Sequence, residues 1–320
     1  RRAPVDAAVR VVEACGVSLA WDHAEGGADT FAKTGEALPE ATIESIRANK
    51  VGLKGPTATP SSGGFRSVNV ELRQRLDLYA NFRPAKSIPG TEERFDQVDL
   101  LVIRENTEGL YSGLEHVVVP GVVESLRIVT EKASRRVVQF AFETARRRGR
   151  QKVTAVHKAN ILKLSDGLFL DVARQVAEDY KDIVYEECIV DACAMKLVVD
   201  PSQFDVLVME NLFGDIISDL CSGLVGGLGL TASGNIGEKL AVFEAVHGSA
   251  PDIAGKGIAN PTALIRSAAL MLDHLGEHDA AQRIEAAIRA VVASGETLTG
   301  DLGGKANTRE FTDAVIGSLQ

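Results

Sequence analysis

Short apolar segments alternate with amphipathic segments along most of this 320-residue chain. Residues 98–103 (VDLLVI), 153–156 and 204–209 have the length and apolar character of strands that are buried on both faces. Because helical spacing of apolar residues fills the intervals between them, the sequence predicts an α/β fold with helices on both faces of a sheet. A further strand is expected at residues 185–190, and helices are expected at residues 4–14, 39–48, 132–148, 166–180, 211–222, 261–275 and 280–293.

Length and charge restrict the class of protein further. A chain of 320 residues is too long for one ordinary core, so two domains are expected. The 35 basic and 44 acidic side chains give a net charge of -9, which argues against nucleic acid or a membrane surface as a partner. The four cysteines form no C-x-x-C pair, and the start of the sequence lacks the apolar core of a signal peptide. We therefore expect reduced thiols and a cytoplasmic location, with the mitochondrial matrix as the alternative.

Residues 114–126 (LEHVVVPGVVESL) are apolar and β-branched on both sides of Pro120 and Gly121. This pattern predicts a hairpin or arm. An exposed apolar ribbon needs a partner surface, so we expect a dimer contact here, with an ordinary core hairpin as the alternative.

Three arginines are candidates for an anion site. Arg73 follows Ser67 and Asn69 on one side of a segment that enters a helix, Arg83 comes ten residues later, and Arg104 stands at the carboxyl end of an expected strand. Open α/β sheets bind ligands at such strand ends, and the planar guanidinium group binds a carboxylate through two hydrogen bonds. The three arginines predict a ligand with about three carboxylates, unless they form three separate surface salt bridges.

Two aspartates, Asp215 and Asp219, are four residues apart in an expected helix, so they share a face and repel each other. A divalent cation such as Mg²⁺ or Mn²⁺ would offset this repulsion, and Asp191, after another strand, would supply a third carboxylate. A solvated acidic face is the alternative.

Other residues are candidates for proton transfer and cofactor binding. Lys158 follows an expected strand and would act as a base, and Tyr111 would act as a proton donor; ordinary solvated side chains are the alternative. The small residues of the segment 247–255 (HGSAPDIAG) would let a flat ligand approach the backbone, where Asp252 would accept hydrogen bonds from ribose hydroxyls. Residues 227–232 match G-x-G-x-x-A but follow a helix, so they predict a turn and not a dinucleotide site.

Eight motifs, taken together and in this order, resemble the β-decarboxylating dehydrogenases, the family of isocitrate, 3-isopropylmalate and homoisocitrate dehydrogenases. They are LKGPTATP (53–60), SVNVELR (67–73), DLYANFRP (77–84), IRENTEGLY (103–111), HKANILK (157–163), NLFGDIISD (211–219), HGSAPDIAGKGIANP (247–261) and TGDLGG (299–304). The resemblance implies the two-domain α/β fold of that family and not a Rossmann domain. Residues 1–78 and 226–320 would form a large cofactor domain, and residues 79–225 would form a smaller domain with the dimerisation arm.

The resemblance also implies roles for individual residues. Tyr111 and Lys158 would be catalytic, Arg73, Arg83 and Arg104 would bind substrate with Ser67 and Asn69, and Asp191, Asp215 and Asp219 would hold Mg²⁺ or Mn²⁺. Lys158 and Asp191 would come from the partner subunit, so activity would need a homodimer or a larger assembly. NAD would be bound by Thr59, Asn160, His247, Gly248, Ser249, Ala250, Pro251, Asp252, Ile253, Asn260 and Asp301. NAD is expected because NADP-using isocitrate dehydrogenases carry lysine and tyrosine in place of Asp252 and Ile253.

The residues before Arg73 indicate the substrate. Isopropylmalate enzymes carry leucines here, whereas Ser67 and Asn69 offer hydrogen bonds to an additional carboxylate. The expected reaction is therefore the metal-dependent oxidative decarboxylation of isocitrate to 2-oxoglutarate with reduction of NAD. The alternatives are 3-isopropylmalate or homoisocitrate as substrate, a non-catalytic regulatory subunit of an isocitrate dehydrogenase, and a binding protein without chemistry. Two departures from the family pattern are that its opening strand and glycine-rich turn do not precede the first expected helix, and that Ala58 replaces a hydroxyl-bearing residue.

Overall fold

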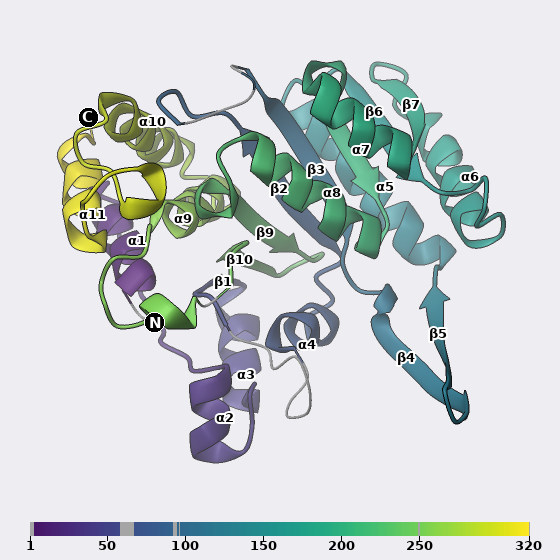
Figure 1. Cartoon of the computed structure of the whole chain (residues 1–320), viewed down its shortest axis with the longest axis horizontal. Coiled ribbons are helices and arrows are strands. Elements are labelled where there is room, and N and C mark those ends of the chain that lie inside the picture. Colours follow the sequence, from purple (N-terminus) through teal and green to yellow (C-terminus); the bar gives the residue numbers. More distant parts are fainter. Residues whose placement is uncertain (1–2, 58–66, 92–94, 96, 249, 320) are drawn as a thin grey trace.

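The computed structural model describes residues 3–57, 67–91, 95, 97–248 and 250–319. Its main sheet contains β1 (Val51–Lys54), β2 (Ala80–Lys86), β3 (Asp99–Glu105), β6 (Lys152–His157), β7 (Val184–Ile189), β8 (Val206–Met209), β9 (Ala232–Ile236) and β10 (Ala241–Ala245). These strands lie in the order β1-β10-β9-β2-β3-β8-β6-β7 (Figure 1). The predicted α/β class is confirmed.

The two ends of the sheet are parallel and its middle is antiparallel. Strands β3, β8, β6 and β7 run parallel at one end, and β1 and β10 run parallel at the other. Strands β2 and β9 join them through antiparallel pairs, in which Asn81 lies directly opposite Asn235. The predicted domain boundaries, after residues 78 and 225, precede β2 and β9, and the division into two domains stays a prediction.

Helices cover both faces of the parallel end because the strands there are apolar on both sides. Leu101 and Ile103 of β3 pack with α5 (Glu131–Arg147) and α6 (Ser165–Ala177). Leu100 and Val102, which point to the opposite face, pack with α7 (Val190–Val199) and α8 (Asn211–Leu224). The predicted arrangement of a sheet between two helical layers is therefore correct.

A second core joins the two ends of the chain (Figure 1). The helices α1 (Ala3–Ala14), α9 (Thr262–His274), α10 (His278–Ser294) and α11 (Thr308–Gly317) share one cluster of buried apolar side chains. The first expected helix thus packs against the last part of the sequence. All four cysteines, Cys15, Cys188, Cys193 and Cys221, are buried free thiols.

The expected hairpin is a two-stranded arm that projects from the rest of the chain (Figure 1). It consists of β4 (Gly109–Val119) and β5 (Val122–Ile128), and so extends beyond the predicted residues 114–126. Val117 and Val123 are 67% and 61% exposed, so the alternative of a buried core hairpin is wrong.

Three short helices, α2 (Ala28–Thr34), α3 (Glu40–Asn49) and α4 (Val68–Arg75), lie in the first quarter of the chain. Of these only α3 was expected, together with the longer helices of the second half; α2, α4, α7, α11 and strands β1, β2, β9 and β10 were not. None of the helices in the described part of the chain combines the length and apolar character of a membrane-crossing segment.

Candidate active site

The three predicted arginines line a single cavity of about 180 Å³. Arg73 lies in the last turn of α4, Arg83 lies in β2, and Arg104 lies near the carboxyl end of β3. All three are buried, and Arg104 is only 1% exposed. Their guanidinium groups converge on one site, so the alternative of three separate surface salt bridges is wrong.

Two polar residues that the sequence places at the substrate site lie around the same cavity. Ser67 immediately precedes α4 and Asn69 lies in its first turn, and both line the cavity. Asn69 Oδ1 accepts a hydrogen bond from Thr57 Oγ1 at 3.1 Å. A hydroxyl group and an amide therefore border the arginines.

The start of α8 fixes the side chain of Arg104. Its Nε and Nη2 atoms donate to Asn211 Oδ1 at 3.0 and 2.8 Å, and its Nη1 atom pairs with Asp215. Gly214 leaves the space that the arginine stem occupies. These contacts explain why the motif NLFGD has its asparagine, glycine and aspartate at this spacing.

Arg83 is held from two directions. Its Nη1 atom donates to Ser218 Oγ at 2.7 Å and to Asp219 Oδ1 at 2.9 Å. Its Nε atom donates to Asn81 Oδ1 at 2.7 Å on the opposite side. The guanidinium group is thereby fixed between α8 and the antiparallel middle of the sheet.

The positive charges around the cavity favour binding of an anion. Burial lowers the pKa of Arg104 to about 10, and repulsion from Arg73 and Arg83 adds to this lowering. Burial and repulsion from Arg73 likewise lower the pKa of Arg83. Since an incoming carboxylate relieves this repulsion, the site favours negatively charged ligands.

Asp215 and Asp219 lie one turn apart on α8 and face the arginines, as their spacing predicts. Burial works to raise the pKa of Asp215, but attraction to Arg104 and the hydrogen bond from Tyr111 outweigh burial and lower it. Burial raises the pKa of Asp219, with Arg83 opposing the shift. We expected a cation to offset the repulsion between the two carboxylates, and in this structure Arg83 and Arg104 offset it.

The two aspartates also fit the predicted cation. Carboxylate oxygens are ligands that Mg²⁺ and Mn²⁺ prefer, and the side chains of Asp215 and Asp219 are 35% and 50% exposed, so they border open space. In the described part of one chain, no three His, Cys, Asp or Glu side chains cluster tightly enough to hold a metal ion. Asp191, the third predicted ligand, lies in the first turn of α7 and does not line the cavity.

Tyr111, the predicted proton donor, lies at the base of the arm and borders the cavity. Its hydroxyl group donates to Asp215 Oδ2 at 2.5 Å, and the guanidinium carbon of Arg104 lies 4.9 Å from the centre of its ring. Burial, followed by the hydrogen bond to Asp215, raises the pKa of Tyr111 above its ordinary value. The phenol therefore stays protonated at neutral pH.

Lys158 is not brought to the arginine cavity within one chain. Its Nζ atom pairs with Asp191, and its backbone N–H donates to the buried Asp166 at 2.5 Å. Asn160, a predicted cofactor ligand, lies exposed in the same turn after β6. The residues that the resemblance assigns to a partner's site, Lys158 and Asp191, are thus together but away from their own chain's arginines.

The predicted cofactor loop follows β10. His247 Nδ1 lies 3.0 Å from the carbonyl oxygen of Gly248, and Asp252 lies exposed in a short 3₁₀ helix, Pro251–Ile253. Among the described residues, no atom lies within 4 Å of the position of a Cβ added to Gly248. This open space beside the backbone of Gly248 fits the approach of a flat cofactor.

Two more distant cofactor candidates meet directly. Asn260 Nδ2 donates to Asp301 Oδ2 at 2.9 Å, which links the end of the loop to the motif TGDLGG. Thr59 and Ser249 lie outside the described residues. After α8, Gly227 precedes a short 3₁₀ turn, Leu228–Leu230, so the turn predicted at residues 227–232 is confirmed.

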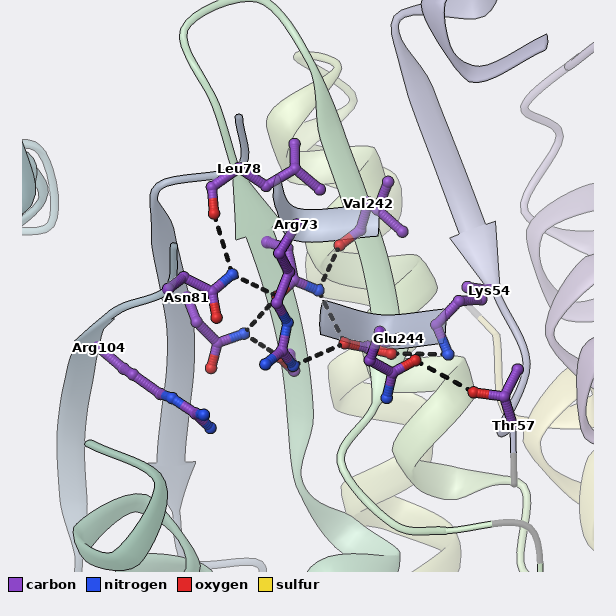
Figure 2. A network of polar contacts seen from close by, with 12 residues as sticks. Lys54, Thr57, Arg73, Leu78, Asn81, Arg104, Val242 and Glu244 are labelled. Atoms are coloured by element: carbon purple, nitrogen blue, oxygen red, sulfur yellow. Dashed lines mark hydrogen bonds and ion pairs between the residues drawn. The ribbon is translucent and has the colours of Figure 1, made fainter. Parts of the chain in front are cut away.

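Glu244, Ser233 and Asn211 are site residues that we did not predict. Glu244 and Ser233 line the cavity, and Glu244 is 4% exposed although its carboxylate is charged. An acidic residue within the apolar segment AVFEA was a usable signal, because a buried charge requires a partner. Arg73 Nη2 lies 3.3 Å from Glu244 Oε1, and Lys54 Nζ lies 2.7 Å from Glu244 Oε2 (Figure 2).

The fold and this cavity define an α/β protein with an anion site built from buried arginines. A family profile described as "Isocitrate/isopropylmalate dehydrogenase" matches residues 5–315, and the chain belongs to this family. The crystal structure of isocitrate dehydrogenase from Methylococcus capsulatus has a TM-score of 0.96 and 54% sequence identity, over 99% of this chain and 95% of that chain.

Relatives with two activities are similar to this chain. The NAD isocitrate dehydrogenase catalytic subunit 5, mitochondrial, of Arabidopsis thaliana is 56% identical over 97% of this chain and 83% of its own length. The human NAD isocitrate dehydrogenase subunit alpha, mitochondrial, is 52% identical over 97% of this chain and 85% of its own length. The chloroplastic 3-isopropylmalate dehydrogenase of Solanum tuberosum is 57% identical over 88% of this chain and 79% of its own length.

Proposed function

We propose that this protein catalyses the oxidative decarboxylation of isocitrate to 2-oxoglutarate with reduction of NAD, and that it requires Mg²⁺ or Mn²⁺. The observation that carries this proposal is the convergence of Arg73, Arg83 and Arg104 on one buried cavity. Three guanidinium groups match the three carboxylates of isocitrate. The NAD isocitrate dehydrogenases among the relatives support the same reaction.

The choice between isocitrate and 3-isopropylmalate rests on Ser67 and Asn69. An isopropyl group at this wall offers no hydrogen-bond acceptor to the Ser67 hydroxyl group or to the Asn69 amide nitrogen, and a buried donor that loses its acceptor costs about 1–3 kcal/mol. A carboxylate would accept hydrogen bonds from both. The similarity to a 3-isopropylmalate dehydrogenase keeps that acid as the second candidate substrate.

The site residues have distinct tasks in this reaction. The arginines bind the carboxylates and orient the substrate, and Lys158, directly or through water, takes the proton of the substrate hydroxyl. When bound, the cation held by the aspartates withdraws electrons from the substrate oxygens, and NAD accepts the hydride. After loss of CO₂, Tyr111 donates a proton to the substrate carbon, which its raised pKa allows because the phenol is protonated at neutral pH.

We further propose that the working unit is a homodimer, or a larger assembly, with shared sites. Lys158 and Asp191 would enter the partner's arginine cavity, and the exposed arm, Gly109–Ile128, would lie in the interface. Support comes from their distance from the cavity of their own chain and from the exposed apolar side chains of the arm. Two relatives are named as mitochondrial proteins, so the mitochondrial matrix and the cytoplasm are both proposed locations.

A spectrophotometric assay tests the reaction. Formation of NADH or NADPH is followed by absorbance with isocitrate, 3-isopropylmalate or homoisocitrate, each with NAD⁺ or NADP⁺ and with Mg²⁺ or EDTA. We expect the highest kcat/KM with isocitrate and NAD⁺, and loss of activity in EDTA. A preference for 3-isopropylmalate would contradict the substrate assignment, and absence of turnover with every acid would favour a non-catalytic subunit.

A further inference from the structure

A continuous chain of hydrogen bonds connects Arg83 to Arg73 through buried side chains. Arg83 Nε donates to Asn81 Oδ1 at 2.7 Å, and Asn81 Nδ2 donates to Asn235 Oδ1 at 2.9 Å. Asn235 Nδ2 then donates to Glu244 Oε1 at 2.8 Å, and Arg73 Nη2 donates to the same oxygen at 3.3 Å. Figure 2 shows Asn81 on one side of Arg73 and Glu244 on the other.

The two asparagines contact the arginine network but not the ligand space. Asn81 and Asn235 are 0% and 2% exposed, and neither lines the cavity. They lie opposite each other in the β2–β9 pair, which is the pair that joins the two ends of the sheet. Asn81 and Glu244 are the side chains through which Asn235 is hydrogen-bonded to the arginines of the cavity.

The sheet itself does not require these side chains. The backbone groups of β2 and β9 pair with each other. Apolar side chains at the same two positions would pack in the interior without needing hydrogen-bond partners. A buried amide must be hydrogen-bonded to avoid a loss of stability, so an apolar pair would serve a purely structural role at these positions at least as well. Here each end of the chain of hydrogen bonds terminates on an arginine of the cavity.

The hydrogen bonds between these residues must hold two arginines in place against their electrostatic repulsion. Arg73 and Arg83 are both buried and line the same cavity, so their positive charges repel each other. Glu244 attracts Arg73 and Lys54, and this attraction outweighs burial and lowers the pKa of Glu244 to about 2. The carboxylate therefore stays ionised and serves as the fixed acceptor for both Arg73 and Asn235.

We infer that Asn81 and Asn235 are positioning residues that fix the separation of the Arg73 and Arg83 guanidinium groups for two carboxylates of one ligand. This inference rests on the proposed function in so far as the ligand is a tricarboxylate. It assigns a part in substrate binding to two side chains that do not themselves line the cavity. Loss of either asparagine should weaken binding of the tricarboxylate without affecting the cofactor loop.

The test compares three asparagines of similar burial. Asn235→Ala and Asn81→Ala break the path between the arginines. Asn106→Ala is the matched control, because Asn106 is also buried and also donates to Asn235 Oδ1, at 3.0 Å, but lies off that path. Asn235→Ser is a milder second variant in case Asn235→Ala does not fold. Each variant is measured for Tm, for KM with isocitrate and with NAD⁺, and for the calorimetric Kd of tricarballylate, an unreactive tricarboxylate.

We expect Asn235→Ala and Asn235→Ser to raise KM for isocitrate and Kd for tricarballylate about tenfold, with KM for NAD⁺ changed less than about twofold. The Asn81→Ala/Asn235→Ala double variant should weaken binding no more than the stronger single variant, since both break one path. Asn106→Ala should lower Tm comparably but leave both constants within about threefold of wild type.

Two results would overturn the inference. One is an Asn235 variant that folds, loses stability and binds tricarballylate as tightly as wild type. The other is an Asn106→Ala variant with the same loss of affinity as Asn235→Ala. Failure of the proposed function would look different, because wild-type protein would then not oxidise isocitrate while the tricarballylate comparison still reported on the asparagines.

Discussion

The aliphatic stem of Arg104 lies directly against the backbone of Gly214. A Cβ atom added to Gly214 would stand 2.6 Å from Arg104 Cβ, and closer still to Cγ. Since carbon atoms do not approach so closely, the arginine stem and a side chain at residue 214 cannot occupy their present positions together. The glycine of NLFGD is thus required by the arginine that crosses it.

Gly214→Ala should therefore displace Arg104 and reduce kcat/KM for isocitrate at least about tenfold, which corresponds to about 1.4 kcal/mol. Gly223→Ala is the matched control, because Gly223 lies in the same helix and, apart from its own helix backbone, no described atom is within 4 Å of its added Cβ. Steady-state kinetics on both variants provide the comparison. Equal activity of Gly214→Ala and Gly223→Ala would mean that the position of Arg104 is not critical.

Asn69→Leu should change substrate preference. The leucine removes the amide from the cavity and takes away the oxygen that accepts the hydrogen bond of the Thr57 hydroxyl group. We therefore expect kcat/KM for isocitrate to fall about tenfold, while that for 3-isopropylmalate stays constant or rises. Asn49→Leu, at the exposed end of α3, is the control and should leave both values unchanged. If Asn69→Leu lowers both values equally, Asn69 does not discriminate between the acids.

Mixed dimers should reveal whether sites are shared between subunits. Lys158→Met and Asp215→Asn should each be inactive as pure proteins, because each lacks a residue of every site. If Lys158 serves the partner's cavity, a mixed dimer has one intact site, and random reassociation of equal amounts should restore roughly a quarter of wild-type activity. Activity is assayed after the two purified variants are unfolded and refolded together. No recovery from a mixture that does form dimers would place Lys158 in its own chain's site.

Glu244 should make stability depend on acid pH. Its pKa of about 2 lies below the ordinary value of 4.5, so the ionised carboxylate stabilises the fold fully above about pH 4.5 and loses this effect as the pH falls toward 2. Glu244→Gln should lower the free energy of unfolding by roughly 3 kcal/mol at pH 7, and by less at pH 3.5. Urea unfolding at both pH values, with the exposed Glu44→Gln as control, measures this difference. A difference that is constant with pH would show that the Glu244 carboxylate is not selectively stabilised in the folded state.

Sequence patterns predicted the elements that bury long apolar stretches. The helix expected at residues 132–148 is α5, Glu131–Arg147, and the strand expected at residues 98–103 is β3, Asp99–Glu105. Strands β1 (VGLK) and β10 (AVFEA) were missed because a glycine or a charged residue interrupts each short apolar segment. Their pairing partners lie far away in the sequence, as β1 with β10 illustrates.

The candidate site was predictable where residue type alone indicates chemistry. Arg73, Arg83 and Arg104 could be singled out as anion ligands, but only the order of strands and helices shows that they meet. The connection from Asn81 to Asn235 spans 154 residues, and an asparagine in a strand has no pattern that distinguishes it from a surface residue. Glu244 was detectable in principle, since its surroundings in AVFEA are apolar.

The most direct measurement of the central claim is a crystal structure of the protein grown with isocitrate and Mg²⁺. The account predicts isocitrate in the cavity between Arg73, Arg83 and Arg104, with its carboxylates hydrogen-bonded to these guanidinium groups and the cation on Asp215 and Asp219. Isocitrate bound at another site, with the three arginines still paired only to protein side chains, would contradict it.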